Sequence, residues 1–202
     1  MPGIRLIVGL GNIGAQYEST RHNAGFWFVD ALARRSAGLW NREARFHGEA
    51  TRVAIGGQSC WLLKPHTLMN RSGQAVAALA GFYKIPLAEI LVAHDELDMA
   101  PGQARLKFDG GVAGHNGLKD IRARCGGAAF WRLRLGIGHP RDVDSRQPVA
   151  DYVLRPPSLD DLRLIDAGID HALEAVEAMV LDDAPGAMQR LHGAVGRPPS
   201  AP

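Results

Sequence analysis

Apolar residues fall along this chain in short runs and in helical stripes that follow one another. Residues Ile4 to Leu10 are almost continuously apolar and end at glycines, which is typical of a central strand buried on both faces. From about Asn23 to Ser36 the apolar positions repeat at helical spacing, with Phe26, Val29 and Ala33 on one buried stripe. The chain therefore begins with a predicted strand and a predicted helix.

The next pattern has the two-residue period of strands. Residues 46–55 and 59–64 alternate between apolar and polar on either side of Gly56-Gly57, which predicts a β-hairpin. Ser72 is expected to cap the helix that follows. The buried face of that helix is expected to carry Val76, Leu79 and Tyr83.

Three further strands are predicted in the middle of the chain. They lie at Ile90 to Ala93, 103–108 and 132–137, where short apolar runs are bounded by polar or glycine residues. The polar pair His94-Asp95 follows the first of them at its C-terminal end. A helix from about Asn116 to Arg124 is predicted between the other two.

The C-terminal part of the chain contains a long helical pattern. Ser158 precedes two aspartates, a start typical of a capped helix with acids in its first turn. The apolar positions that follow at helical spacing are Leu162, Ile165, Ile169, Leu173, Val176 and Val180. A shorter helix is expected at about Ala184 to Leu191, and the proline-rich tail 193–202 is expected to be disordered.

Strands that alternate with helices favour one fold class. We expect residues 1–192 to form a single compact α/β domain, with a mixed, twisted β-sheet flanked by helices. A length of 202 residues suits one well-buried core and is short for two. The apolar fraction of 46% and the charged fraction of 22% are ordinary for a soluble globular protein.

Three features bear on where the chain works. No apolar run approaches the ~20 residues needed to cross a bilayer. The first residues lack the layout of a signal peptide. Cys60 and Cys125 lie in apolar or glycine-rich surroundings, which predicts buried free thiols rather than a disulfide. A cytoplasmic chain without membrane contact is therefore expected.

Charge is distributed unevenly, although the net charge is only +2. Between Arg105 and Arg134 there are seven basic residues against two acidic ones, whereas from Gln147 onward there are four basic against nine acidic. The basic residues of the first segment are Arg105, Lys107, Lys119, Arg122, Arg124, Arg132 and Arg134. This asymmetry predicts that one side of the molecule faces phosphates.

Separated polar segments carry the groups of a hydrolytic site. His22 and Asp95 match a general base and its orienting carboxylate, because such a histidine can deprotonate water. Asn12, Asn70 and Asn116 offer donors and acceptors in fixed geometry, which suits them to hold a carbonyl group. The combination predicts a hydrolase with neither a metal nor a covalent nucleophile. Taken singly, His22 also fits a local hydrogen bond and Asp95 the cap of a turn.

Other chemistries fit the sequence less well. Gly9-x-Gly11-x-x-Gly14 after a strand matches the dinucleotide-binding fingerprint, but a polar, non-periodic segment separates it from the predicted helix. The histidines and acids show neither HExxH nor CxxC spacing, so no metal is expected. Ser72 lacks the Gly-x-Ser-x-Gly context of a nucleophile elbow.

The order and wording of these motifs resemble the bacterial-type peptidyl-tRNA hydrolase family over roughly residues 4–192. The matching segments are Gly9 to Gly14, Thr20 to Phe26, Lys64 to Gly73, His94 to Asp98, Gly114 to Lys119 and Arg132 to Pro140. Three positions depart from the pattern. Ile13 stands where proline is usual, His66 where glutamine is common, and Leu68 where an aromatic ring is usual.

The resemblance implies hydrolysis of the ester between a peptide and the 3′-terminal ribose of tRNA. In that reaction His22 is the general base, Asp95 orients it, and Asn12 recognises the N-blocked peptide. The residues expected to contact peptide or tRNA are Tyr17, Leu68, Met69, Asn70, Lys107, His115, Asn116 and Arg134. Among these, Lys107 and Arg134 are expected to hold phosphates near the acceptor end.

The resemblance also implies that the enzyme needs no cofactor and works as a monomer on the acceptor end of peptidyl-tRNA. Two other classes remain open from the sequence. One is a dinucleotide-binding oxidoreductase. The other is a non-catalytic module that binds tRNA or the ribosome.

Overall fold

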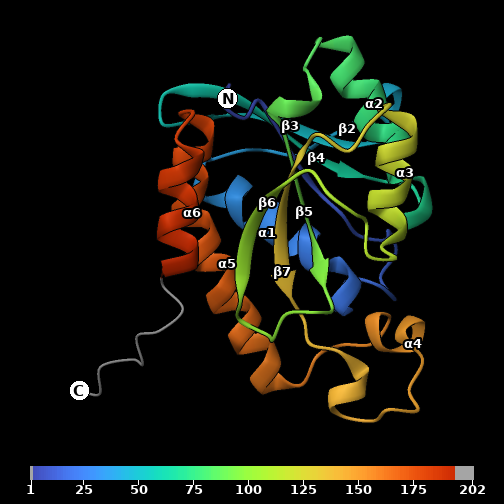
Figure 1. Ribbon diagram of the computed structural model, residues 1–202. Coiled ribbons are helices and arrows are strands. Elements are labelled where there is room, and N and C mark those ends of the chain that lie inside the picture. The colour runs from blue at the N-terminus through green and yellow to red at the C-terminus, as the bar shows by residue number, and fades with distance from the viewer. Residues whose placement is uncertain (1, 194–202) are drawn as a thin grey trace.

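A computed structural model describes residues 2–193, which form one α/β unit (Figure 1). Its sheet has seven strands in the order β2-β3-β4-β1-β5-β7-β6. The strands are β1 (Leu6–Gly9), β2 (Asn41–Glu43), β3 (Gly48–Ile55), β4 (Gln58–Pro65), β5 (Ile90–Glu96), β6 (Ala104–Phe108) and β7 (Trp131–Gly136). The central pairs β4-β1, β1-β5 and β5-β7 are parallel, whereas the outer pairs are antiparallel. The predicted mixed sheet is confirmed.

Helices cover both faces of this sheet. The α-helices are α1 (Ala24–Arg35), α2 (Ser72–Phe82), α3 (Asn116–Arg124), α4 (Val149–Val153), α5 (Leu159–Val180) and α6 (Ala184–Gly193). Short 3₁₀ turns are η1 (Arg21–Asn23), η2 (Ala44–Phe46), η3 (Met69–Arg71), η4 (Leu87–Glu89) and η5 (Pro140–Asp142). Helices α2 and α3 lie on one side, with α5 and α6 on the other (Figure 1). Helix α4 lies beyond the carboxyl end of β5.

The alternation of side chains along β1 divides the core into two clusters. Ile7 packs with residues of α1 and α5, whereas Leu6 and Val8 pack with residues of α2 and α3. All three side chains are fully buried. The continuous apolar run predicted to be a strand buried on both faces is therefore confirmed, since each face of β1 meets a helical layer.

The buried stripe of α1 differs from the predicted one. Phe28 and Leu32 join Val29 and Ala33 in the core, but Phe26 is only half-buried. The Phe26 ring lies so close to Gly11 that a Cβ at that glycine would clash with it. Phe26 therefore packs on the loop after β1 instead of on the sheet.

The prediction for Ser72 was wrong. Ser72 is the first residue of α2, and its hydroxyl donates a hydrogen bond backward to the Met69 carbonyl at 2.7 Å. The residue at the cap position is Arg71, which makes no side-chain cap bond. By contrast, the Ser158 hydroxyl accepts from the Asp161 amide at 3.1 Å, which confirms the predicted start of α5.

Two strand boundaries also differ. β3 begins at Gly48 rather than at residue 46, because residues 44–46 form a 3₁₀ turn that ends at His47 with φ of 51°. β5 continues to Glu96, so His94 and Asp95 belong to the strand. Pairing with β7 extends β5 to that point, and the local sequence does not carry this information.

Two smaller expectations can be compared with the structure. Cys60 and Cys125 are both free thiols as predicted, but only Cys60 is buried as expected, whereas Cys125 is half-buried. Among the described residues, no helix is long and apolar enough to span a membrane. Helix α6 extends to Gly193, and the rest of the predicted tail lies outside the described residues.

Candidate active site

A cavity of about 650 Å³ opens at the carboxyl ends of the parallel strands. This is where open α/β sheets place their ligands. Nearly all the predicted site residues line it, namely Asn12, His22, Leu68, Met69, Asn70, Asp95, Lys107, His115, Asn116 and Arg134. Tyr17 is the exception, since it is half-buried in the turn before η1 and does not line the cavity.

Close backbone packing brings His22 to the strand that carries Asp95. Gly25, in the first turn of α1, faces the backbone of Leu10 and Ala93 so closely that a Cβ would clash with both. The start of α1 therefore rests directly on β1 and β5. Because η1 immediately precedes α1, the His22 side chain reaches the end of β5.

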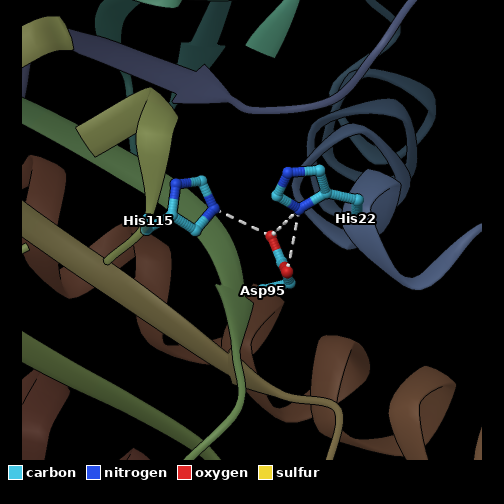
Figure 2. Close-up of side chains that lie close together, drawn as sticks. All are labelled: His22, Asp95 and His115. Atoms are coloured by element: carbon cyan, nitrogen blue, oxygen red, sulfur yellow. Dashed lines mark hydrogen bonds and ion pairs between the residues drawn. The ribbon is translucent and has the colours of Figure 1, made fainter. Parts of the chain in front are cut away.

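Asp95 is the centre of the site, with two imidazole rings turned toward its carboxylate (Figure 2). His22 Nδ1 lies 3.0 Å from each carboxylate oxygen, and His115 Nε2 lies 2.8 Å from Oδ1. A carboxylate only accepts hydrogen bonds, so the proton of each facing nitrogen points at Asp95. Neutral His22 is thereby held with Nδ1 protonated and Nε2 free to accept a proton.

His22 and Asp95 each stabilise the charged form of the other. Burial alone lowers the pKa of His22, but the charge of Asp95 and its hydrogen bond outweigh burial and raise that pKa above 6.5. Burial alone raises the pKa of Asp95, but His22 and His115 hold it well below its usual range. Asp95 is therefore ionised at neutral pH, and His22 is a stronger base than a free histidine.

Both ring nitrogens of His115 form hydrogen bonds within the protein. Its Nε2 donates to Asp95, and its Nδ1 accepts from the amides of Gly117 and Leu118 at 3.2 and 3.4 Å. The imidazole thus caps the N-terminus of α3, where Ser, Thr, Asp or Asn is usual. His115 lines the cavity as predicted, but these bonds engage both of its nitrogens within the protein.

Asn12 is held rigidly by a residue that the sequence analysis did not single out. The Asn23 side chain accepts from the Asn12 amide at 2.8 Å and donates to the Asn12 carbonyl at 2.9 Å. The Asn12 side-chain oxygen in turn accepts from the Met69 amide at 2.9 Å. Its NH₂ group, which makes no hydrogen bond within residues 2–193, is left to donate to a ligand.

Asn70 and Asn116 differ from Asn12 in exposure and in hydrogen bonding. Both are exposed, both line the cavity, and neither side chain has a hydrogen-bond partner among the residues described. The side-chain amides of Asn70 and Asn116 are therefore available to hydrogen-bond a ligand in the cavity.

Arg21 was also missed by the sequence analysis. It is buried, its Nη1 donates to the carbonyls of Tyr152 and Arg155 at 3.0 and 3.2 Å, and its guanidinium lies 3.8 Å from the centre of the Tyr152 ring. Tyr152 belongs to α4, whose Val149 and Val153 line the cavity. Arg21 thus attaches this apolar wall to the segment that carries His22.

Basic side chains occupy one face of the β6-β7 ribbon. Arg105 pairs with Arg134 and Lys107 with Arg132 in the antiparallel register, so all four side chains share that face. Arg134 is neutralised by Glu96, with Nε 3.0 Å from Oε2, while Lys107 is exposed. Arg105, opposite Arg134, is a further candidate for contact with phosphates. In the sequence it was counted only as one member of the basic segment.

Arg132 does not belong to the exposed basic surface. It is 2% exposed, and its guanidinium donates to the carbonyls of Ala128, Phe130 and Gly110 at 3.1 to 3.2 Å. Three backbone carbonyls therefore fix this side chain, which ties the loop after β6 to the loop before β7. Local sequence cannot distinguish such a buried arginine from its exposed neighbours.

Comparisons with known proteins agree with this geometry. A family model described as peptidyl-tRNA hydrolase matches residues 6–198. The chain is 53% identical over 194 residues to the peptidyl-tRNA hydrolases of Cupriavidus pinatubonensis and Cupriavidus necator, covering 94% of this chain and 98% of each relative. A crystal structure of peptidyl-tRNA hydrolase from Acinetobacter baumannii superposes with a TM-score of 0.90 at 48% identity, covering 95% of both chains.

The chain belongs to the peptidyl-tRNA hydrolase family. The resemblance recognised in the sequence motifs is thereby confirmed, as is the expected fold. The rival dinucleotide-binding interpretation is not favoured. Helix α1 begins only at Ala24, so its N-terminus does not follow the glycine turn that ends at Gly14.

A metal site in this member of the peptidyl-tRNA hydrolase family would have to use the same three side chains. Within residues 2–193, His22, Asp95 and His115 offer ligand atoms that lie within 4.8 Å of one another. Two imidazoles and a carboxylate are ligands that zinc accepts. Here the two ring N–H groups are directed at the carboxylate, and a metal would have to displace both protons. The expectation of a metal-free site stays a prediction.

Proposed function

We infer that this chain hydrolyses peptidyl-tRNA, cleaving the ester between the peptide and the 3′-terminal ribose. The observation that carries this inference is family membership across nearly the whole chain, together with an intact His22–Asp95 pair in the cavity. Such an activity releases tRNA from peptidyl-tRNA that has left the ribosome. The substrate is a product of translation, so the cytoplasm is the proposed place of action.

His22 is proposed to act as the general base. Its Nε2 takes a proton from water while the water oxygen attacks the ester carbonyl, and Asp95 stabilises the imidazolium that forms. The bond from the acyl carbon to the ribose 3′-oxygen then breaks, and the imidazolium gives its proton to that departing oxygen. The raised pKa of His22 supports this role, because a stronger base takes up the proton more readily. An ester has a good leaving group, so positioned water suffices without a covalent intermediate.

The asparagines are proposed to position the substrate. Asn12 donates from a rigid frame toward the N-blocked peptide, while Asn70 and Asn116 hold the peptide backbone, the scissile carbonyl or the water. Donors aimed at the carbonyl oxygen stabilise the negative charge that develops there during attack. Met69, Leu68 and His115 complete the wall around them.

The basic face of β6 and β7 is proposed to hold tRNA phosphates. Lys107 is exposed, so its charge can meet a phosphate, whereas Arg134 is already paired with Glu96. Lys107 and Arg134 both line the cavity, and Arg105 lies opposite Arg134 in the register. Tyr17 is proposed to contact the terminal nucleotide from outside the cavity. One chain supplies all these groups, so a monomer is the proposed working unit.

The deciding experiment compares two substrates. Wild-type protein should release the N-acetylated amino acid from N-acetylated aminoacyl-tRNA and leave free aminoacyl-tRNA intact. The His22→Ala variant should bind uncharged tRNA like wild type but not hydrolyse the blocked substrate. Tight tRNA binding without hydrolysis by the wild-type protein would instead identify a non-catalytic tRNA-binding module.

A further inference from the structure

A third histidine contacts Asp95 at its backbone carbonyl rather than at its carboxylate. His94 is 2% exposed, and its Nδ1 lies 2.8 Å from the backbone carbonyl oxygen of Asp95. A carbonyl only accepts, so the neutral His94 ring carries its proton on Nδ1. Its Nε2 is buried without a hydrogen-bond partner in residues 2–193, which leaves the contact with Asp95 as the polar bond of this side chain.

The same ring also packs on the other partner of Asp95. The centres of the His94 and His115 rings are 5.0 Å apart with an interplanar angle of 71°, an edge-to-face contact. His115 in turn donates to Asp95 Oδ1. His94 therefore restrains Asp95 twice, directly at its peptide group and indirectly through the ring bonded to its carboxylate.

We propose that His94 is a positioning residue for the hydrolytic reaction, holding the Asp95 carboxylate in the orientation that meets His22 Nδ1 with both oxygens. This inference rests on the proposed function. A carboxylate that turns about its side-chain torsions keeps its charge but loses the paired contacts at 3.0 Å. Because small misplacements of catalytic groups cost about 10²-fold in rate, such restraint has kinetic consequences.

His94 can do this at any working pH. The groups that face it are His115 before α3, Asp95 on its own strand and Arg132 on β7. Burial lowers the pKa of His94 to about 3, with His115 and Arg132 acting in the same direction and Asp95 opposing them. The ring consequently stays neutral while His22 titrates, and its bond to the Asp95 carbonyl is unaffected.

Two amide substitutions separate positioning from simple packing. His94→Asn places an N–H near the position of Nδ1 and preserves the bond to the Asp95 carbonyl. His94→Gln places its N–H near Nε2 and loses that bond at similar polarity. His171→Gln, an exposed position on α5, is the matched control. Activity is measured on N-acetylated aminoacyl-tRNA, with thermal melting and binding of uncharged tRNA as parallel readouts.

We expect His94→Gln to lower kcat by about 10- to 100-fold with KM unchanged. Its kcat–pH midpoint should also move downward, because a misdirected Asp95 carboxylate loses its hydrogen bond to His22 and raises the pKa of His22 less. His94→Asn should keep most of the wild-type kcat and the wild-type midpoint. If His94→Gln does not fold, His94→Phe, which keeps the ring contact with His115 and loses the bond, replaces it.

Unchanged kcat and midpoint in a folded His94→Gln or His94→Phe would overturn the proposal. Equal losses in the Asn and Gln variants that follow only their melting temperatures, with an unmoved midpoint, would overturn it as well, since they indicate a packing role. Failure of the proposed function itself would give a different experimental result from failure of the His94 proposal. In that case the wild-type protein itself leaves the N-acetylated substrate intact.

Discussion

Replacing Asp95 by Asn tests the charge and the geometry of the site in one step. The carboxylate accepts from His22 at two contacts of 3.0 Å and from His115 at 2.8 Å. An amide has one acceptor oxygen and one NH₂ donor, so it cannot accept from His22 with both of its terminal atoms as the carboxylate does. The NH₂ group therefore faces the Nδ1–H of His22 in either orientation of the amide, and His22 either turns away or changes tautomer.

The expected magnitude follows from these contacts. The wild-type pKa of His22 is raised because Asp95 outweighs burial, so removing the charge leaves burial to lower it below 6.5. A weaker, wrongly oriented base should reduce kcat by about 10²- to 10⁴-fold. That loss corresponds to roughly 3 to 5 kcal/mol of transition-state stabilisation.

The assay is single-turnover hydrolysis of N-acetylated aminoacyl-tRNA as a function of pH. Hydrolysis needs unprotonated His22, so the wild-type rate should fall as pH drops through a midpoint above 6.5, the ordinary pKa of histidine. In Asp95→Asn the midpoint should lie below that value. Asp170→Asn, at an exposed position on α5, controls for the loss of one carboxylate elsewhere.

Two results would refute the reasoning. An unmoved or higher midpoint in Asp95→Asn would show that the carboxylate does not set the basicity of His22. Full additivity with His22→Ala in the double mutant would show that the two residues act independently. We expect the single loss to be smaller than that of His22→Ala and the two losses to be non-additive.

Three further predictions concern the general base His22, the contact of Lys107 with tRNA phosphates and the expected absence of a metal requirement. His22→Ala should lower the rate by about 10²- to 10⁴-fold and leave tRNA binding intact; near-wild-type turnover would end the mechanism. Lys107→Ala should flatten the log–log salt dependence of tRNA binding by about one unit, whereas Arg163→Ala on α5 should not. An identical slope for Lys107→Ala would remove it from the binding site. Treatment with EDTA should leave hydrolysis unchanged, and a loss restored by zinc would reveal a metal enzyme.

Most elements of this fold are encoded locally. The apolar run at β1, the hairpin of β3 and β4 around Gly56-Gly57, the cap at Ser158 and the bounds of α3 were predictable, because side-chain periodicity and turn chemistry act over a few residues. Helix α4 was missed because five residues carry too little periodicity to identify a helix.

The identities of the cavity residues were also predictable, since His22, Asp95 and the three asparagines stand in motifs that resemble a known family. The hydrogen-bond partners of these residues were not predictable. The sequence places His94 and Asp95 at the end of a predicted strand and His115 before a predicted helix, but it does not say which nitrogen meets which oxygen.

Tertiary structure alone decided those partners. It made His115 a helix cap that also donates to Asp95, and it turned His94 onto the Asp95 carbonyl. It buried Arg132 while leaving Lys107, opposite in the register, exposed. The physical reason is that local propensity depends on neighbours along the chain. Hydrogen-bond partners and burial depend instead on which strands the sheet places side by side.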